Sequence, residues 1–175
     1  MFQRSHGLGT GEIGTWLFGL GFFGMVGTFG AGYLCDRLGE KDRRWYMWLP
    51  GIMTLMHVPF AAFTYLYHDP QIALMVYAVA YILGHGYLAP TFAMTQSLVP
   101  LRMRALAASI LLFILNIIGL GLGPQITGIL SDTINLTTDL GVNSLRWAMV
   151  SVLVFNIISA VLYIMAGRTV VEDMR

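Results

Sequence analysis

The side chains best suited to bind a solute lie inside long apolar stretches of this sequence. His85 stands between Gly84 and Gly86, and Tyr81 precedes it by about one helical turn. The remaining members of this group are Pro90, Thr91, Thr95, Gln96 and, in a later stretch, Asn116. Transporters bind their substrates where membrane helices are interrupted near the middle of the bilayer. The group therefore predicts a flexible gate that lines a cavity.

The same residues also admit structural roles. A buried polar side chain is usually a satisfied hydrogen-bonding group, and this interpretation of His85 stays open. Asn116 could join two helices through a hydrogen bond worth ~0.6 kcal/mol, or it could face the cavity. We weigh these two interpretations of Asn116 equally.

Other kinds of chemistry are disfavoured by the residues present. The apolar stretches contain no convergent Ser/His/Asp or His/Asp/Glu set, so a membrane-embedded enzyme is not expected. The four histidines have no metal-ligand spacing, and the single cysteine, Cys35, excludes an intrachain disulfide. Gly119 to Gly128 lacks the Lys-Ser/Thr pair of a phosphate loop. We expect no metal and no cofactor.

Composition points to a membrane protein. Hydrophobic residues make up 57% of the chain and charged residues 11%, whereas a soluble domain averages about 25% charged. A net charge of +1 without a basic face also argues against nucleic-acid binding. About 20 apolar residues span a bilayer core, so the partner of this chain is a lipid bilayer. The expected membrane helices are 12–34, 45–67, 71–97, 105–130 and 145–167, and the third is expected to bend or break around Gly84, Gly86 and Pro90.

The segments between these helices fix an expected orientation. They are an outer segment 1–11, a turn 35–44, a turn 98–104, an outer loop 131–144 and a tail 168–175. Eight basic residues fall on one side, against Arg4 and Arg146 on the other. The eight are Arg37, Lys41, Arg43, Arg44, Arg102, Arg104, Arg168 and Arg175. The positive-inside rule therefore predicts a cytoplasmic C-terminus and an external N-terminus.

Glycines and prolines have expected structural roles in two of the helices. In 12–34, Gly24 and Thr28, like Gly27 and Ala31, are four residues apart, a spacing that lets two membrane helices approach closely. Glycines and a proline are also clustered in the fourth helix, where they predict bending and close packing. These residues are Gly119, Gly123 and Pro124.

One segment carries a recognisable motif. Gly32-x-Leu34-x-Asp36-Arg37-x-Gly39, followed by Lys41, Arg43 and Arg44, resembles the signature loop of the major facilitator superfamily. We call Gly32–Arg44 the signature segment. Glu40 departs from the basic residue that usually follows the second glycine. The stretches GLGLGPQITGILSD, DRRWYMWLP and PTFAMTQSLVPLRMRA extend the resemblance, and they resemble bacterial spinster-like members in particular.

The resemblance implies an all-α membrane protein with five helices, a partial major-facilitator half-bundle. It aligns the five helices with the last five of a twelve-helix transporter, so the partners include a missing N-terminal half and a missing seventh helix. We interpret the chain as a fragment from a truncated or partial gene. In this fold His57 and Asn156 would lie on peripheral helices, and we expect structural roles for them.

The implied function is secondary active transport by alternating access, coupled to H+ or another ion. The cargo would be a small organic or amphipathic, lipid-like solute. The alternative is a non-transporting scaffold or accessory subunit. In the transporter, Asp36 would act as a latch by facing the positive end of a neighbouring helix in the missing half. This interaction would contribute ~0.3–1 kcal/mol. Alternatively, Asp36 and Arg37 only end a helix and set the topology.

Reporter fusions test the predicted orientation. A reporter fused after Arg175 should read cytoplasmic, and one inserted between residues 132 and 144 should read periplasmic or extracellular, because of the distribution of basic residues. Paired phosphatase and fluorescent-protein fusions measure this. The opposite pattern would contradict the number of spans and the motif assignment together.

Overall fold

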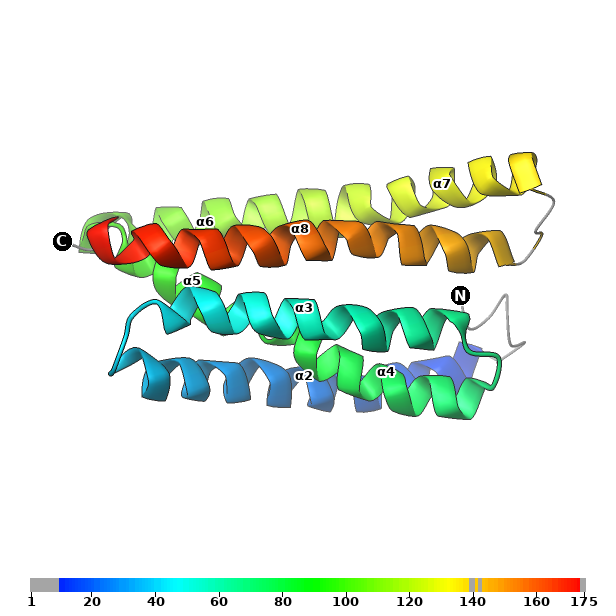
Figure 1. Cartoon of the computed structure of the whole chain (residues 1–175), viewed down its shortest axis with the longest axis horizontal. Coiled ribbons are helices and arrows are strands. Elements are labelled where there is room, and N and C mark those ends of the chain that lie inside the picture. Colours follow the sequence, from blue (N-terminus) through cyan, green and yellow to red (C-terminus); the bar gives the residue numbers. More distant parts are fainter. Residues whose placement is uncertain (1–9, 139–140, 142, 174–175) are drawn as a thin grey trace.

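The computed structural model describes residues 10–138, 141 and 143–173, and these residues are almost entirely helical. Figure 1 shows the helices lying lengthwise in two groups, with α2, α3 and α4 in one and α6, α7 and α8 in the other. The longer helices are α2 (Thr10–Gly39), α3 (Trp45–Leu66), α4 (Pro70–His85), α7 (Gly123–Thr138) and α8 (Asn143–Asp173). The shorter ones are α5 (Leu88–Ser97), η1 (Leu101–Met103), α6 (Arg104–Ile114) and the π-helical η2 (Leu115–Leu122).

Five stretches of the described chain are long and apolar enough to cross a membrane. They are Phe18–Gly39, Trp45–Leu66, Gln71–Ser97, Leu101–Thr138 and Asn143–Val170. The all-α, five-span architecture is the one that the sequence predicts. Asp69 begins the third stretch by accepting hydrogen bonds from the amides of Gln71 and Ile72, with Pro70 at the first helical position.

Several helices extend beyond the ends that the sequence predicts. α2 continues through Gly39, which shortens the predicted turn 35–44. α7 continues to Thr138, so most of the predicted outer loop 131–144 is helical. α8 runs to Asp173 and takes in most of the predicted tail 168–175, and the expected outer segment 1–11 lies outside the described residues apart from Thr10 and Gly11 in α2. Hydropathy marks where a helix leaves the bilayer, and the helix itself can continue into water.

The predicted small-residue face of α2 packs against α4. Gly24, Gly27 and Ala31 are buried there. A Cβ built on Gly27 would overlap the carbonyl group of Ile82, and its distance to the carbonyl carbon would be 2.9 Å. The two backbones therefore meet without an intervening side chain, which is the use of small residues in membrane helices.

The third span is broken because Pro90 has no amide hydrogen. The carbonyl of Gly86, four residues earlier, therefore cannot receive its helical hydrogen bond. The Gly86 amide donates to the Leu83 carbonyl at 3.2 Å, in place of the Ile82 carbonyl that it would bond in an α-helix. The helix resumes as α5 with the bond from the Thr91 amide to the Tyr87 carbonyl at 3.0 Å. The break lies at Gly86 and Tyr87, close to where the sequence predicts it.

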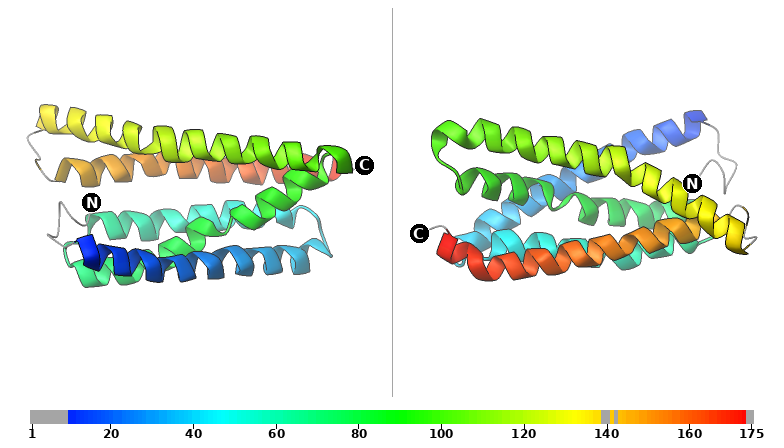
Figure 2. Two further views of the ribbon diagram at one scale, coloured as in Figure 1. Left: turned by 180° about the vertical axis from the view of Figure 1, so that it is seen from behind. Right: turned by 90° about the horizontal axis from the view of Figure 1, so that it is seen from above.

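The fourth span changes its winding at a comparable place. Pro124 cannot donate to the carbonyl of Leu120, and the preceding residues, with Gly119 and Gly121, form the π-helical η2. Figure 2 shows α6, η2 and α7 as one continuous rod, which meets α8 at the α7 end. Among the described residues of this span only Ser131 is buried, so most of its apolar side chains form an uncovered face.

A matched pair of glycine substitutions tests the α2–α4 contact. Gly27→Val should destabilise the protein by ~1–3 kcal/mol or more, because the new side chain meets backbone. Gly30→Val is the control, since a Cβ on Gly30 has no atom within 4 Å. Thermal unfolding in mild detergent measures the difference, and equal melting temperatures for the two variants would contradict this packing.

Candidate functional site

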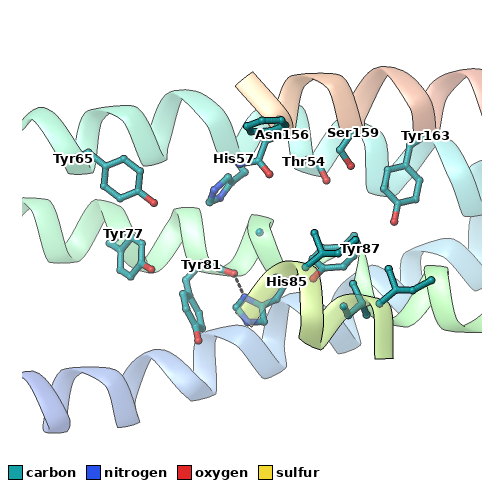
Figure 3. Close-up of a pocket in the computed structure, with 16 residues that line it drawn as sticks. Thr54, His57, Tyr65, Tyr77, Tyr81, His85, Tyr87, Asn156, Ser159 and Tyr163 are labelled. Atoms are coloured by element: carbon teal, nitrogen blue, oxygen red, sulfur yellow. Dashed lines mark hydrogen bonds between the residues drawn. The ribbon is translucent and has the colours of Figure 1, made fainter. Parts of the chain in front are cut away.

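A cavity of about 640 Å³ lies between the two groups of helices. Figure 3 shows its labelled residues in two facing rows, one from α3 and α8 and the other from α4 and the α4–α5 junction. The fourth span closes it with aliphatic groups. The lining consists of Thr54, His57, Tyr65, Tyr77, Tyr81, Gly84, His85, Tyr87, Ile114, Leu115, Ile118, Gly119, Phe155, Asn156, Ser159 and Tyr163.

The lining is rich in aromatic residues and, among the described residues, includes no Asp, Glu, Lys or Arg. On α4 the ring of Tyr81 lies 5.7 Å from that of Tyr77 and 4.1 Å from that of His85, measured between centroids. Tyrosine and histidine offer hydrogen bonds and π faces on an apolar body. Such a surface suits an amphipathic group.

Two histidines line the cavity, and their hydrogen bonds define their tautomers. Nδ1 of His57 lies 2.8 Å from the Ala80 carbonyl of α4, and Nδ1 of His85 lies 2.9 Å from the Tyr81 carbonyl. A carbonyl can only accept, so Nδ1 carries the hydrogen in both rings. His57 and Asn156, which the sequence places on peripheral helices, both reach this cavity. Both side chains reach it because α3 and α8 face the space between the groups, and the structural roles expected for them stay a prediction.

The other predicted gate residues are more scattered. Pro90 is buried in α5. The Thr91 hydroxyl lies 2.7 Å from the Tyr163 hydroxyl of α8, and Thr91 and Thr95 line a separate, shallow cavity of about 290 Å³. Gln96 is half-buried on α5. The structure thus brings together Tyr81 and His85 at the large cavity and places the residues from Pro90 onward beyond the break.

Asn116 lies at the start of η2, where its side chain is exposed. Its Nδ2 donates to the Leu112 carbonyl of its own helix at 2.7 Å. In the structure it neither joins two helices nor lines the large cavity. Of the predicted bending residues, Gly119 lines that cavity, whereas Gly123 and Pro124 begin α7.

The signature segment forms a second site at one end of the molecule. Asp36 and Arg37 lie in the last turn of α2, and the Tyr46 hydroxyl of α3 donates to Asp36 Oδ1 at 2.6 Å. A Cβ on Gly39 would overlap the Tyr46 ring, so only glycine leaves room for this contact. The sequence predicts a contact of Asp36 with a helix end, and the structure gives it a side-chain donor in the first turn of α3.

The basic residues of the signature segment surround this contact. Arg37 lies over the Tyr33 ring at 5.5 Å, and Arg44 lies over the Trp48 ring at 6.0 Å while its amide donates to Asp42 at 3.0 Å. Gly32 packs near Ala89, and Lys41 is exposed. Arg43 lines a cavity of about 320 Å³ that also includes Asp36, Glu40, Tyr46 and three residues of α5, namely Ala93, Met94 and Ser97.

Sequence reasoning did not find most of the cavity lining. The sequence alone does not identify Tyr46 as the partner of Asp36. The lining residues that it does not single out are Tyr65, Tyr77, Tyr87, Ser159, Tyr163 and Phe155. A usable signal existed in the spacing of four residues that links Tyr77, Tyr81 and His85, and again Phe155, Ser159 and Tyr163. That spacing gives two polar-aromatic stripes, but periodicity alone does not show that they face each other.

Comparison with known proteins gives consistent matches over nearly the whole chain. The family model described as Major Facilitator Superfamily matches residues 1–173. An MFS-type efflux pump of Mycolicibacterium smegmatis is 34% identical over 180 residues, covering 99% of this chain and 41% of that protein.

Solved structures of a bacterial homolog of the human lysosomal transporter Spinster also match. The inward-facing, unoccupied form has a TM-score of 0.85 at 26% identity, over 98% of this chain and 43% of that one. The inward-facing, occupied form has a TM-score of 0.83 at 27% identity, over 98% and 44%. The chain therefore spans about two fifths of the length of these relatives.

Proposed function

We propose that this chain, which belongs to the major facilitator superfamily, is the part of a secondary active transporter that supplies one wall of its solute pathway. It is an integral membrane protein of a family of transporters. The observation that carries the proposal is the fold match at a TM-score of 0.85 to a bacterial transporter.

We further propose that the chain works with additional spans of the same protein, as the last five of twelve helices. Major-facilitator halves contain two inverted three-helix repeats. In the structure α4 packs against α2 and α3. Its counterpart in the other repeat would pack against the fourth span and α8, where the large cavity lies. That cavity would then seat a seventh helix, and the uncovered face of α6, η2 and α7 would meet the N-terminal half.

The proposed cargo is a small organic or amphipathic, lipid-like solute. The resemblance of the sequence to spinster-like transporters supports this class, and the fold match to a bacterial Spinster homolog agrees with it. Coupling to H+ or another ion is also part of the proposal. The described spans hold carboxylates only toward their ends, at Asp36 and Asp132, so we place the coupling carboxylate in the additional spans. The orientation remains the one that the basic residues predict, in a bacterial inner membrane.

A proteoliposome assay tests the proposed function. The protein with every span that its gene encodes should accumulate or release a fluorescent amphipathic dye when a pH gradient is imposed, and an ionophore that dissipates the gradient should abolish the movement. Residues 1–175 alone are the comparison and should give no movement. Gradient-driven movement by 1–175 alone would contradict the need for further spans. No movement of any solute by the whole protein would favour the scaffold alternative.

The signature segment gives a second, sharper prediction for the whole protein. Asp36→Asn should lower transport about five- to thirtyfold, because a carboxylate at a helix end contributes ~1–2 kcal/mol to one conformation. Tyr46→Phe should reproduce part of the loss by removing the donor to Asp36 Oδ1. Solute flux at matched protein density in the membrane measures both.

Asp69→Asn is the control. Asp69 is the exposed N-cap of α4, and it lies near the end of α3 that is remote from Tyr46. Insertion should be normal in all three variants, because acidic residues contribute little to topology. If Asp36→Asn and Tyr46→Phe both transport at the wild-type rate, the segment is only a topological anchor.

A further inference from the structure

The first and the fourth span share a sequence pattern. Residues 27–36 of α2 read GTFGAGYLCD, and residues 123–132 of α7 read GPQITGILSD. Aligned without a gap, the two segments are identical at four positions, namely Gly27 and Gly123, Gly32 and Gly128, Leu34 and Leu130, and Asp36 and Asp132. The pattern Gly-x-Leu-x-Asp that begins the signature segment therefore occurs a second time. We call Gly128–Asp132 the second copy.

The two copies occupy equivalent places in the two proposed repeats. The signature segment lies at the end of α2, before α3, and the second copy lies near the end of α7, before α8. Figure 1 shows these two helix ends at opposite ends of the molecule. Inverted repeats place equivalent residues on opposite sides of the membrane. With the predicted orientation, Asp36 is therefore on the cytoplasmic side and Asp132 is on the external side.

Both copies are fixed to the following helix by the residue that precedes the aspartate. Cys35 is fully buried, and its thiol donates to the Trp45 carbonyl at the start of α3, with an S···O distance of 3.7 Å. Ser131 is also buried, and its hydroxyl lies 3.2 Å from the hydroxyl of Ser144 in the first turn of α8. Successive side chains of a helix point about 100° apart, so the residue after each buried one turns outward. Both aspartates are accordingly exposed.

The surroundings of Asp132 suit a contact with the additional spans. Asp132 follows Ile129 by three residues and precedes Leu136 by four, so the three side chains share one face of α7. Ile129 is 68% exposed and Leu136 is 85% exposed, which places Asp132 on the uncovered face that we propose to meet the N-terminal half. Asp36 accepts from the Tyr46 hydroxyl, whereas Asp132 makes no hydrogen bond or ion pair with the part of the chain that the structure describes. Its carboxylate is thus open to a partner in the additional spans.

We propose that Asp132 is a positioning residue of the transport cycle, which holds the protein closed on its external side by facing the positive end of a helix in the N-terminal half. The inference rests on the proposed function, because it needs a second half and alternating access. A carboxylate stabilises such a helix end, whereas the amide of an asparagine carries no charge. Asp36 is predicted to act in the same way on the cytoplasmic side. Since alternating access closes one side at a time, the two aspartates favour opposite conformations.

Hydrogen–deuterium exchange of the whole protein, measured without solute, tests this opposition. Asp132→Asn should shift the balance of conformations about two- to fivefold toward the externally open state, in line with a charge at an exposed helix end. Exchange should therefore rise in the peptide that contains Gly128–Thr138 and fall in the signature segment. Asp36→Asn should give the opposite pattern. Asp69→Asn is the matched control, because Asp69 is another exposed acid on the predicted external side, and it should change neither peptide.

The double variant Asp36→Asn/Asp132→Asn separates this role from a structural one. Because distant sites act additively, exchange in both segments should lie between the values of the two single variants. Asp132→Ser also removes the charge and should reproduce Asp132→Asn, whereas Asp132→Glu keeps the charge and should leave exchange unchanged. Changes of the same direction in both single variants, or more exchange in the double variant than in either, would overturn the proposal.

Exchange is read without transport, so the two proposals fail separately. Opposite shifts in a protein that moves no solute would contradict only the proposed function. A transporting protein in which Asp132→Asn leaves the signature segment unchanged would contradict only this inference.

Discussion

The absence of water around the membrane spans is the constraint on which this structure depends. Every backbone N–H and C=O in the bilayer needs a partner from the protein itself, which is why the described spans are almost entirely helical. Prolines at positions 90 and 124 each leave the carbonyl four residues earlier without its helical donor. The chain accommodates this loss in two ways. Around Pro90 the helix breaks at Gly86 and Tyr87, and α2 and α3 donate to the nearby His85 and Ala80 carbonyls. Before Pro124 the helix stays continuous by changing to a π-helical winding. The second solution needs no partner helix, which agrees with the absence of buried residues in η2.

Close packing is the second consequence, because donors as short as threonine reach a neighbouring helix only when the backbones nearly touch. Gly24 and Gly27 bring α2 onto α4, and only then does Thr28 lie within 3.3 Å of the His85 carbonyl. On the other side Gly84 makes room for the His57 ring. Glycines weaken a helix in water. Here they allow the polar contacts that stabilise the broken third span in lipid.

Much of the fold could be predicted from the sequence, because span length, small-residue spacing and proline position act locally. The five spans, the α2 face and the break near Gly86 are such cases. The helix ends at Gly39, Thr138 and Asp173 could not be predicted, since a helix can continue past the membrane boundary that hydropathy records. The site was predicted only in part. His85 and Tyr81 stand out by type, but the contribution of His57 and Asn156 depends on how α3 and α8 face α4, which is a tertiary arrangement.

The contact between Tyr46 and Asp36 changes what the signature segment can do. A carboxylate that only faced a helix end would interact with a diffuse partial charge and would tolerate shifts of the helix along its axis. A hydrogen bond of 2.6 Å from a phenol to a carboxylate is directional and is lost over a small displacement. Because Gly39 must lie under the Tyr46 ring and α5 closes the same small cavity, the bond responds to the position of both α3 and α5. Such a bond would distinguish two discrete arrangements of its neighbours, as the proposed latch between two conformations requires and a topological anchor does not.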